Sequence, residues 1–571
     1  MTQTACRICE GPLQLRYRGD DAALTPEVMA PTNHAPGRHG DLYACGNCGT
    51  VQQPGGPRGE ELAQLYRGMG DDHYLTEEAG RRATAARLLD SIADHVPAGR
   101  LLDVGCGHGL LLDEARSRGY SVTGLELSET AASYAREVLQ LDVLEQSIEE
   151  LAAGEVPGFQ VIVMADVLEH LDDPLAALDA CERLLAPGGV LCVITPDPSS
   201  RTARLAGPRW WAYIPAHTFL FPRLTMRELL ESRGLVISED QPLRRSFTLG
   251  YWARGLGQRA GRLATAADAV TRTRAGRRRL TLSLADERLV LAHKVPVTRA
   301  PKPLMRNRGT DFRVHVVLPA YNAAKTIPEV AASMPVDAAD AALLVDDASA
   351  DDTSEVALSR GFDVIRTPAN RGYGGNQKTS YVRAILDGAD AVVMVHADNQ
   401  YDPALVARMV KPIEADIADV VVGSRLLEDE TIAGGMPRWK WIGNRVLTSI
   451  ENLAFRRGYS EYHTGYRAFS TDILRSIAFL RNDDGFVFDQ QIFAQLIAAH
   501  ARVIELPIPT RYFREASSVS FSASVKYGLR TLAVLVRYRL DERRPGWSLL
   551  RPPAAQLSAP GARKRRVSAR R

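Results

Sequence analysis

The sequence predicts an α/β protein in which a small cysteine-rich module precedes two parallel-sheet domains. Two Cys-X-X-Cys pairs lie within the first fifty residues and predict the module. A short apolar run leading into a glycine-rich turn and a helical stretch occurs near residue 100, and a second series of apolar strands begins near residue 314. The chain has 571 residues. Because one hydrophobic core stops growing at roughly 250–300 residues, we expect separate domains.

The composition is that of an ordinary globular protein. Hydrophobic residues make up 45%, charged residues 24%, and the formal net charge is +2. This balance gives no bulk reason to expect a nucleic-acid partner. No basic start precedes an apolar core at the N-terminus, and no uninterrupted apolar run reaches the roughly 18 residues that a membrane span needs. The sequence therefore predicts a cytoplasmic protein.

The module, predicted over residues 1–60, has the pattern of a structural zinc site. Its four predicted ligands are Cys6, Cys9, Cys45 and Cys48. Two Cys-X-X-Cys turns can present four thiolates to one tetrahedral Zn²⁺ at ~2.3 Å. Four thiolates complete the shell, so we interpret His34 and His39 in the intervening loop as bystanders. Free thiols in a loop are the alternative.

The segment RLLDVGCGHG, which starts at Arg100, predicts a cofactor-binding turn. An apolar strand runs directly into the glycines, and the next strand, SVTGLELS, carries Glu126 at its end. Glycines let the backbone approach a cofactor closely, and an acidic side chain at the tip of the second strand can accept hydrogen bonds from ribose hydroxyls.

With the later segments FQVIVMADVLEHLDDP and LLAPGGVLCVITP, this pattern resembles the class I S-adenosylmethionine-dependent methyltransferases over about residues 80–240. The resemblance implies a Rossmann-like, seven-stranded doubly wound sheet in a domain of residues 61–297, with S-adenosylmethionine across the strand C-termini. It implies the following cofactor-binding residues: Asp103, Gly105, Gly107, Gly109, Glu126, Ser147, Ile148 and Asp166. Ser147 and the backbone of Ile148 stand where many relatives use an Asp to bind adenine.

A sulfonium methyl group is already activated, so the enzyme mainly has to align an acceptor and remove its proton. Candidate bases are Asp166, His170, Tyr213 and His217. Tyr213 and His217 lie in RWWAYIPAHTFLF, where relatives often place acceptor-site residues, and we assign His217 to catalysis. A packing histidine beside aromatic residues is the alternative. Similarity to sugar methyltransferases with an N-terminal zinc module implies a sugar-like acceptor.

A basic, proline-containing stretch, predicted as a linker over residues 298–312, separates this domain from a second one at 313–540. The second domain begins with a buried strand, a turn into a helix, and another strand that ends in Asp346 and Asp347. A carboxylate at the C-terminal end of a parallel strand is well placed to accept the N–H groups of a nucleotide base.

With NRGYGGNQKTS and ADAVVMVHADNQYDP, this set resembles the inverting family 2 glycosyltransferases of GT-A fold, specifically the dolichol-phosphate mannose synthase and polyprenyl-phosphate glycosyltransferase group. The resemblance implies a nucleotide-sugar donor. It implies the following donor-binding residues: Pro319, Tyr321, Asn322, Asp346, Asp347, Asn370, Gly372, Gly375, Arg425, Gly465, Tyr466 and Arg467. Arg425 and Arg467 are the cations expected on the diphosphate, with Arg514 as a third.

The segment HADNQ stands where many relatives have Asp-X-Asp-X-Gln. Asp398 and Gln400 retain oxygen ligands suited to Mg²⁺ or Mn²⁺, whereas His396 replaces the first carboxylate. This replacement is compatible with weaker metal binding, with a preference for Mn²⁺, or with a site of Asp398, Gln400 and the diphosphate alone. A degenerate, inactive domain is the alternative.

Asp489 lies near the position of the general base in relatives that glycosylate alcohols, and we assign Asp398 and Asp489 to catalysis. A lipid-phosphate acceptor would need no strong base, because it is already largely anionic near pH 7. A polyprenyl phosphate and a saccharide therefore both stay open as acceptors.

The C-terminal region predicts two further features. SVKYGLRTLAVLVRYRL is an apolar stripe with basic flanks, compatible with docking on an anionic membrane surface or packing on its own domain. Residues 541–571 end in GARKRRVSARR and predict a disordered basic tail, either solvated or in contact with a membrane.

The sequence as a whole predicts a bifunctional transferase of envelope polysaccharide or glycolipid assembly. The alternatives are one non-catalytic half, or an RNA-directed methyltransferase that uses the zinc module and tail. The basic residues gather in one short tail without an aromatic-rich basic strand, which argues against nucleic acid.

Overall fold

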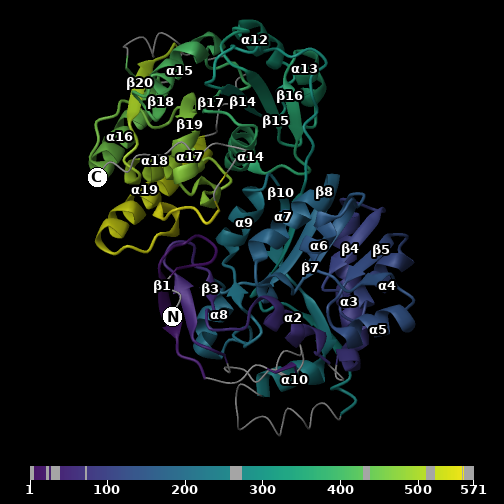
Figure 1. Cartoon of the computed structure of the whole chain (residues 1–571). Helices are drawn as coiled ribbons and strands as arrows, with labels where there is room; N and C mark the ends of the chain where they lie inside the picture. The colour runs from purple at the N-terminus through teal and green to yellow at the C-terminus, as the bar shows by residue number, and fades with distance from the viewer. Residues whose placement is uncertain are drawn as a thin grey trace. The chain divides into compact units, whose positions relative to one another are not determined.

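Two compact units make up the protein. The computed structural model describes residues 5–20, 25–26, 39–70, 74–257, 273–427, 438–509, 521–555 and 557. The chain divides into Met1–Lys294 and Val295–Arg571, and each unit contains a seven-stranded sheet flanked by helices (Figure 1). This confirms the predicted α/β class. Within the described ranges, no helix combines the length and the hydrophobicity needed to cross a bilayer.

The N-terminal module is a small antiparallel sheet. Its strands are β1 (Leu13–Tyr17), β2 (Leu42–Cys45) and β3 (Val51–Gln52). A fourth strand, β9 (Phe219–Leu220), comes from far along the chain and pairs with β3. A segment this small has little apolar surface of its own, and the later strand supplies part of its core.

The large sheet of the first unit has the strand order β10-β13-β8-β7-β4-β5-β6. Five strands are parallel: β4 (Arg100–Val104), β5 (Ser121–Leu125), β6 (Val143–Leu144), β7 (Phe159–Ala165) and β8 (Leu185–Pro196). At the edge, β13 (Glu287–His293) runs antiparallel to both β8 and β10 (Val236–Pro242). The chain passes outward from β4 to β6 and then returns to β7, so the strand order reverses beside β4, where such sheets form a ligand crevice.

The helices of this unit begin with α2 (Gly59–Arg67), α3 (Glu78–Ala93), α4 (Leu110–Ser117), α5 (Glu129–Glu137) and α6 (Ile148–Ala153). They continue with α7 (Pro174–Leu184), α8 (Arg201–Ala206), α9 (Arg223–Glu231) and α10 (Leu249–Gly257). Short 3₁₀ turns occur at η1 (Tyr74–Glu77), η2 (Leu168–His170) and η3 (Gly207–Arg209). A two-stranded ribbon pairs β11 (Arg245–Thr248) with β12 (Arg279–Leu282).

The sheet of the second unit has the order β16-β15-β14-β17-β19-β18-β20. Its parallel half contains β14 (Val314–Ala320), β15 (Ala341–Asp346), β16 (Asp363–Arg366) and β17 (Ala391–Met394). Its other half contains β18 (Val420–Ser424), β19 (Arg467–Ser470) and β20 (Val503–Pro507), and β19 is antiparallel to both of its neighbours.

The helices of this unit begin with α12 (Ile327–Ser333), α13 (Thr353–Ser359), α14 (Gly372–Leu386) and α15 (Val406–Glu414). They continue with α16 (Arg438–Phe455), α17 (Thr471–Ser476), α18 (Phe488–Ala498) and α19 (Phe521–Arg543). Three 3₁₀ turns are described: η5 (Pro403–Leu405), η7 (Phe479–Arg481) and η8 (Ser548–Leu550).

The stretch predicted as a linker lies on the second unit. Thr298 exchanges backbone hydrogen bonds with Val364, and the Leu304 N–H donates to the Gly361 carbonyl at 2.8 Å. The backbone of this basic, proline-containing stretch is thus hydrogen-bonded to the second unit at Thr298 and Leu304.

The prediction of a disordered tail is wrong for its first part. Trp547, Leu549 and Leu557 are buried in the second unit, and Arg475 Nε donates to the Leu557 carbonyl at 2.9 Å. The large apolar side chains among the prolines bury enough surface to hold this stretch. Residues 558–571, which carry the basic end of the tail, lie outside the described residues.

Candidate functional sites

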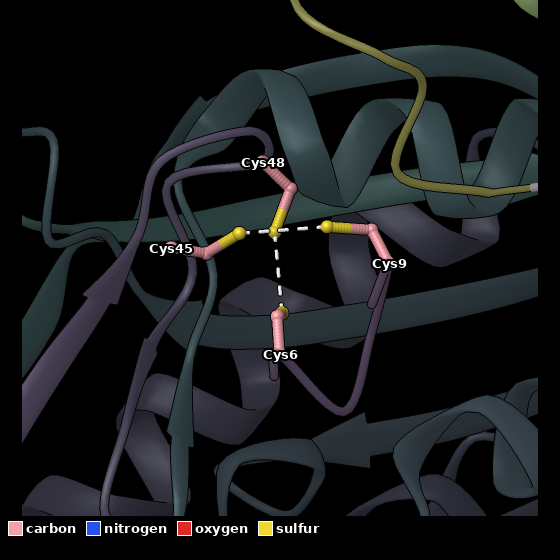
Figure 2. A group of neighbouring side chains, drawn as sticks. All are labelled: Cys6, Cys9, Cys45 and Cys48. Atoms are coloured by element: carbon pink, nitrogen blue, oxygen red, sulfur yellow. Dashed lines mark hydrogen bonds between the residues drawn. The ribbon is translucent and has the colours of Figure 1, made fainter. Parts of the chain in front are cut away.

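Four cysteines converge in the N-terminal module (Figure 2). The Sγ atoms of Cys6 and Cys48 are 3.7 Å apart and those of Cys9 and Cys45 are 3.4 Å apart. A tetrahedron with Zn–S distances of ~2.3 Å has edges of about 3.8 Å, so these positions fit one zinc ion. Backbone N–H groups of Ile8 and Asn47 donate to cysteine sulfurs, as in metal-binding turns.

The sequence predicts His34 and His39 as bystanders of the cysteine cluster, and the structure describes only His39. His39 Nδ1 lies 2.7 Å from the Gly40 carbonyl oxygen, and its ring packs against Tyr213. It is not among the clustered ligand atoms. His34 lies outside the described residues.

The module supports the segment that carries His217. Gln53 Nε2 donates to the carbonyl oxygens of Ile214 at 2.7 Å and of His217 at 2.6 Å. Thr225 Oγ1 donates to the Cys48 carbonyl at 2.5 Å, next to the cysteine cluster. A metal in the cluster would therefore stabilise the backbone around His217.

The glycine-rich turn has the conformation and the space that a cofactor needs. Gly105, Gly107 and Gly109 have φ angles of 68°, 53° and 78°, in the left-handed region that favours glycine. A Cβ atom at Gly107 would meet nothing nearer than Tyr74 Oη at 3.7 Å. The turn therefore leaves its central backbone open to a ligand.

Two buried carboxylates lie beside this turn. The Gly107 N–H donates to Glu126 Oε2 at 2.7 Å, and the Ser128 N–H donates to Oε1 at 2.8 Å. Asp103 is 4% exposed, and burial together with the nearby Glu126 raises its pKa to about 8. Burial also raises the pKa of Glu126. Two carboxylates that are costly to ionise suit a ligand that brings positive charge.

The other predicted cofactor residues have structural partners of their own. Ser147 caps helix α6: its Oγ accepts from the Glu150 N–H, and Glu150 binds back to the Ser147 N–H. Ile148 is buried in the first turn of that helix. Asp166 accepts two hydrogen bonds from Arg245 Nη2, at 2.6 and 2.7 Å. This ion pair argues against Asp166 as a free base.

Of the remaining candidate bases, His170 and His217 are in contact with each other, whereas Tyr213 lies elsewhere. The rings of His170 and His217 are 4.6 Å apart, and Tyr66 Oη lies 2.9 Å from His170 Nδ1. Tyr213 is buried instead among the aromatic side chains against the cysteine module. Sequence reasoning missed Tyr66 and also Tyr74, which stacks on His108 at 4.7 Å, because neither lies in a recognisable motif.

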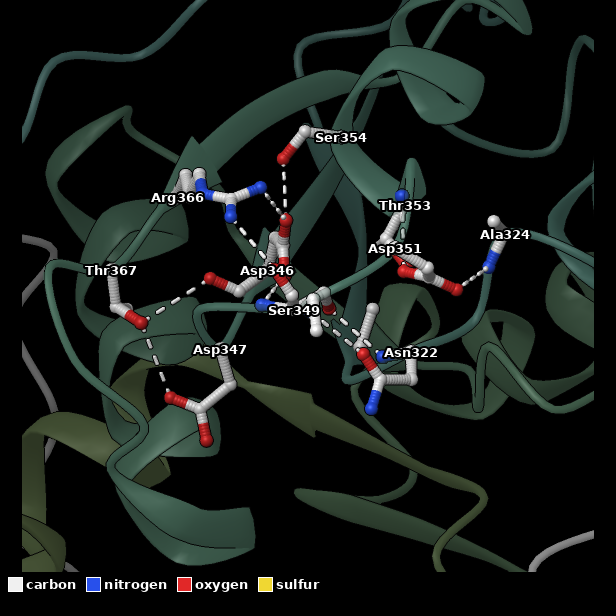
Figure 3. A network of polar contacts seen from close by, with 12 residues as sticks. Asn322, Ala324, Asp346, Asp347, Ser349, Asp351, Thr353, Ser354, Arg366 and Thr367 are labelled. Atoms are coloured by element: carbon white, nitrogen blue, oxygen red, sulfur yellow. Dashed lines mark hydrogen bonds and ion pairs between the residues drawn. The ribbon is translucent and has the colours of Figure 1, made fainter.

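In the second unit, the two adjacent carboxylates at the end of β15 point in different directions (Figure 3). Asp346 is fully buried and binds Ser354 Oγ at 2.5 Å and Arg366 Nη1 at 3.2 Å. Asp347 accepts the N–H groups of Arg371 and Gly372, both at 2.8 Å. Burial raises the pKa of Asp347. Asp346 therefore stabilises the loop that follows β15, while the carboxylate of Asp347 lies at the N-terminus of helix α14.

The other residues assigned to the nucleotide gather around the same sheet edge. Pro319 is in register with Val345 on the neighbouring strand. Asn322, with φ of 51°, accepts the Ala350 N–H at 2.9 Å, and Asn370 Nδ2 donates to the Asp347 carbonyl at 3.2 Å. Tyr321 is exposed. Gly372 has φ of 81°, and Gly375 lies close against Arg371.

His396 is half-buried beside a group of polar side chains in the second unit. Its Nε2 is 3.4 Å from Tyr373 Oη, and a Cβ atom at Gly465 would be 1.9 Å from that nitrogen. Burial lowers the pKa of His396, so its imidazole is neutral at pH 7. Gly465 is therefore required here to make room for the imidazole ring. Tyr466, next in the chain, is buried and donates to the Asp402 carbonyl.

Asp489 belongs to the same group. It accepts Arg467 Nη1 at 2.9 Å, Gln377 Nε2 at 3.3 Å and Tyr373 Oη at 3.2 Å. These partners come from α14 and β19, so the fold joins residues that are far apart in sequence. Tyr373 and Gln377 join the candidate donor site through these contacts, although the sequence analysis did not select them. Their position in the first turns of α14, just after the glycine-rich loop, is the sequence feature that could have identified them.

The two arginines expected on a diphosphate are already paired with carboxylates. Arg467 is fully buried against Asp489, and Arg425 Nε donates to Glu461 at 2.8 Å. Buried charges need such partners. The contact of Arg425 and Arg467 with a diphosphate stays a prediction. Arg514 lies outside the described residues.

The predicted divalent-metal residues offer oxygen donors. Asp398 Oδ1 accepts the Gln400 N–H at 3.1 Å, and both side chains are partly exposed. A carboxylate and an amide oxygen suit Mg²⁺ or Mn²⁺. Among the described residues, Asp398 does not form a ready-made cluster of three ligands, so a metal here would need ligands from a bound diphosphate.

In comparisons with known proteins, the two units match different family models. A model described as "Methyltransferase domain" matches residues 76–239, and one described as "Glycosyl transferase family 2" matches residues 315–478. An uncharacterized protein of Methanocaldococcus jannaschii is 31% identical over 235 residues, which are 41% of this chain and 95% of that protein.

Two further similarities are more partial. A ubiquinone biosynthesis O-methyltransferase of Xanthomonas campestris pv. campestris is 40% identical over 114 residues, 19% of this chain, and the chain spans about half, 48%, of that relative's length. A crystal structure of glucosyl-3-phosphoglycerate synthase from Mycobacterium tuberculosis, with Mn²⁺, UDP and glucosyl-3-phosphoglycerate, is 18% identical. The similarity covers 40% of this chain and 81% of that chain with a TM-score of 0.31, too low to support any conclusion.

We expect Cys45→Ser to remove zinc from the cysteine cluster and to loosen the segment around His217, because that segment is hydrogen-bonded to the module. Elemental analysis should show the loss of one zinc ion per chain. The melting temperature should fall by several degrees, at roughly 2–4 °C per kcal/mol lost. Cys181→Ser, a matched loss of a buried thiol outside the cluster, should keep the zinc. Unchanged zinc content in Cys45→Ser would contradict the assignment.

S-adenosylmethionine binding should weaken as pH falls from about 8 to 6. A bound cation favours the ionised form of Asp103, whose pKa is about 8 in the ligand-free protein. Binding therefore releases a proton, and below that pKa affinity should drop by up to about tenfold per pH unit. Calorimetry in buffers of different ionisation enthalpy measures both effects. Asp103→Asn should bind more weakly and with a flatter pH profile, whereas an equal pH slope in this variant would refute the linkage.

Proposed function

We propose that the chain, whose two units match a methyltransferase domain model and a glycosyl transferase family 2 model, transfers a methyl group from S-adenosylmethionine to a sugar-like acceptor and a glycosyl group from a nucleotide-diphospho-sugar to a lipid phosphate or saccharide. We assign both reactions to envelope polysaccharide or glycolipid assembly. The buried carboxylates Asp103 and Glu126, beside the open glycine turn, support the assignment of methyl transfer. The polar side chains around Asp489 support the assignment of glycosyl transfer.

In the first unit, the chain's own residues would hold the cofactor by charge and hydrogen bonds. Glu126 already accepts two backbone N–H groups, so ribose hydroxyls would exchange with or add to these donors. Asp103 would balance the positive charge of the ligand. When bound, S-adenosylmethionine supplies a methyl group that is activated by its sulfonium. The protein then has to place an acceptor and remove its proton.

His170 and His217 are the groups best placed to act on that acceptor. They follow β7 and precede β9, at the C-terminal edge of the sheet where the glycine turn also lies. His217 Nδ1 lies 2.8 Å from the Ala212 carbonyl oxygen. In the neutral ring, this contact places the proton on Nδ1 and the lone pair on Nε2.

In the second unit, the pairing of Asp489 favours an anionic acceptor. Its carboxylate already accepts hydrogen bonds from Arg467, Gln377 and Tyr373, so its oxygens are engaged by the protein rather than directed at an acceptor hydroxyl. A phosphate monoester is already largely anionic at pH 7 and needs little help from a base. A polyprenyl phosphate is therefore the preferred acceptor, and a saccharide is the second candidate.

Donor activation is assigned to Asp398 with Gln400. A divalent cation on these oxygens would neutralise charge on the leaving diphosphate. His396, neutral and packed on Gly465, would then shape the sugar pocket through Tyr373 without adding charge.

Asp398→Asn should lower donor turnover at least ~100-fold, because the variant loses the only carboxylate that we assign to the divalent cation. Release of UDP or GDP from a panel of nucleotide-sugars is the measurement, with Mg²⁺ or Mn²⁺ and with either polyprenyl phosphate or a saccharide as acceptor. Asp472→Asn, at an exposed aspartate on α17, is the matched control and should keep full activity. Absence of nucleotide release from every donor, in either metal, would end the glycosyltransferase proposal.

Peripheral membrane association belongs to the same proposal. Helix α19 buries Val534, Leu535 and Tyr538 on its own unit. Its other face exposes Leu529, Val536 and Leu540. Exposed basic residues lie along that face: Lys526, Arg530, Arg537, Arg543 and Arg544. The neighbouring helix α16 also exposes apolar side chains, Ile442, Val446 and Leu453. Apolar and basic groups together suit an anionic lipid surface, where a lipid-phosphate acceptor would lie.

The protein should co-sediment with vesicles that contain anionic phosphatidylglycerol and much less with pure phosphatidylcholine vesicles, because the exposed basic residues need a negative surface. Leu529→Ser combined with Leu453→Ser should reduce the bound fraction several-fold. Leu205→Ser, at a leucine that is 89% exposed in the first unit, should bind like the unsubstituted chain. Equal sedimentation of all three proteins would exclude this surface as the membrane contact.

A further inference from the structure

Three potential metal ligands lie together in the first unit, away from the cysteine cluster. They are Glu169, His170 and His217, and their ligand atoms all lie within 4.8 Å of one another. Glu169 and His170 belong to the 3₁₀ turn η2 after β7, whereas His217 is reached only after β8 and α8. The fold brings them together, because the segment between α8 and β9 returns over the C-terminal end of β7.

Both imidazoles are oriented by backbone carbonyls. His217 Nδ1 is 2.8 Å from the Ala212 oxygen, and His170 Nδ1 is 3.1 Å from the Ala216 oxygen. A ring that donates its Nδ1 proton to a carbonyl carries its lone pair on Nε2. Histidines that bind metals in proteins are held in this way, with the second nitrogen bound to a carbonyl or carboxylate. The carbonyl contact of His217 therefore favours the tautomer that binds a metal through Nε2, and His170 Nδ1 is held between the Ala216 carbonyl and Tyr66 Oη.

The environment of Glu169 also favours a bound cation. Its side chain is fully buried. Thr195 Oγ1 donates to Oε2 at 3.2 Å, while Oε1 has no hydrogen-bond partner among the described residues. No Lys or Arg in the described part of the chain forms an ion pair with it, in contrast to nearby Asp166, which Arg245 binds. A buried carboxylate oxygen without a partner is costly, and a bound cation would offset that cost.

The location connects these residues to the cofactor turn. Strands β4 and β7 are parallel neighbours, so the loops after them lie side by side. A Cβ atom at Gly105 would be 2.7 Å from Val167 Cγ2, two residues before Glu169. An ion held by the three side chains would therefore lie on the same sheet edge as the methyl donor.

We propose that Glu169, His170 and His217 bind a divalent transition-metal ion, such as Zn²⁺, Fe²⁺ or Mn²⁺, that coordinates a hydroxyl oxygen of the methyl acceptor. Two imidazoles and one carboxylate form a ligand set that leaves coordination positions open for substrate. The inference rests on the proposed methyltransferase function and narrows it to methylation of oxygen.

The chemistry of the ion explains why the acceptor would be a hydroxyl compound. A metal-bound hydroxyl loses its proton, here to solvent, more readily than a free one. The oxygen then forms a bond to the methyl carbon as the carbon–sulfur bond of the donor breaks, and that electron pair remains on sulfur. His170 and His217 serve in this reaction as ligands, and no separate base is needed.

The test is the number and type of ions bound by the full chain. After reconstitution with Zn²⁺ and removal of excess metal, elemental analysis should give two ions per chain. His217→Ala and His170→Gln should each retain only one ion, the one bound by the cysteine cluster. With Co²⁺, the ion lost from the histidine variants should lack the intense thiolate charge-transfer bands of the cysteine cluster.

His95→Ala is the matched control. His95 also packs against a second histidine, His293, at 4.7 Å and lies 3.3 Å from a carboxylate oxygen of Glu239, but it is outside the candidate group. It should keep two ions. One ion in the unsubstituted chain, or two ions in both His170→Gln and His217→Ala, would overturn the proposal.

The metal proposal and the methyltransferase proposal can fail separately. Calorimetry of S-adenosylmethionine binding tests the methyltransferase function alone, because the cofactor contacts at Asp103 and Glu126 do not include the metal ligands. A chain that binds S-adenosylmethionine and methylates at an unchanged rate with only its cysteine-bound ion refutes the second metal site. A chain that holds two ions but never binds S-adenosylmethionine refutes the methyltransferase function.

Discussion

A carboxylate at the end of one strand, bound by backbone N–H groups of a glycine-containing turn, organises the ligand edge of both units. In the first unit Glu126 accepts the Gly107 N–H, and in the second Asp347 accepts the Gly372 N–H. The turn must place its N–H groups inward, and both glycines have positive φ angles. A ligand with hydroxyl or N–H donors can replace or extend these bonds without leaving the carboxylate unpaired. The same physical device therefore suits two different nucleotide-containing ligands.

Burial of charge constrains the rest of each site. Arg467 binds Asp489 and Arg425 binds Glu461, because an unpaired ion in the interior would cost several kcal/mol, and Arg245 binds the partly exposed Asp166. These pairs fix loops from distant parts of the chain in one arrangement. They also pair charged side chains that the sequence assigns to ligands. Glu169 differs because no Lys or Arg among the described residues forms an ion pair with it. This difference makes Glu169 a candidate metal ligand.

The cysteine module also has a role that its size does not suggest. It takes β9 into its sheet and binds the carbonyl of His217 through Gln53. A structural metal in the module would thus also stabilise the segment around His217. This link gives a physical reason for the presence of a small metal module beside a methyltransferase.

The sequence by itself determined the two families, the strand–turn–helix units and the four cysteines, because these depend on local spacing and on short-range backbone chemistry. The glycines of RLLDVGCGHG and the carboxylate after the next strand are readable without a structure, since adjacent parallel strands place them at one edge. The tertiary structure decided which side chains meet. Tyr373, His396, Arg467 and Asp489 come from separate elements, and the histidines at 170 and 217 meet only through the return of the chain over β7. It also decided how charges are paired, and the pairing of a charge depends on three-dimensional neighbours that no local pattern encodes.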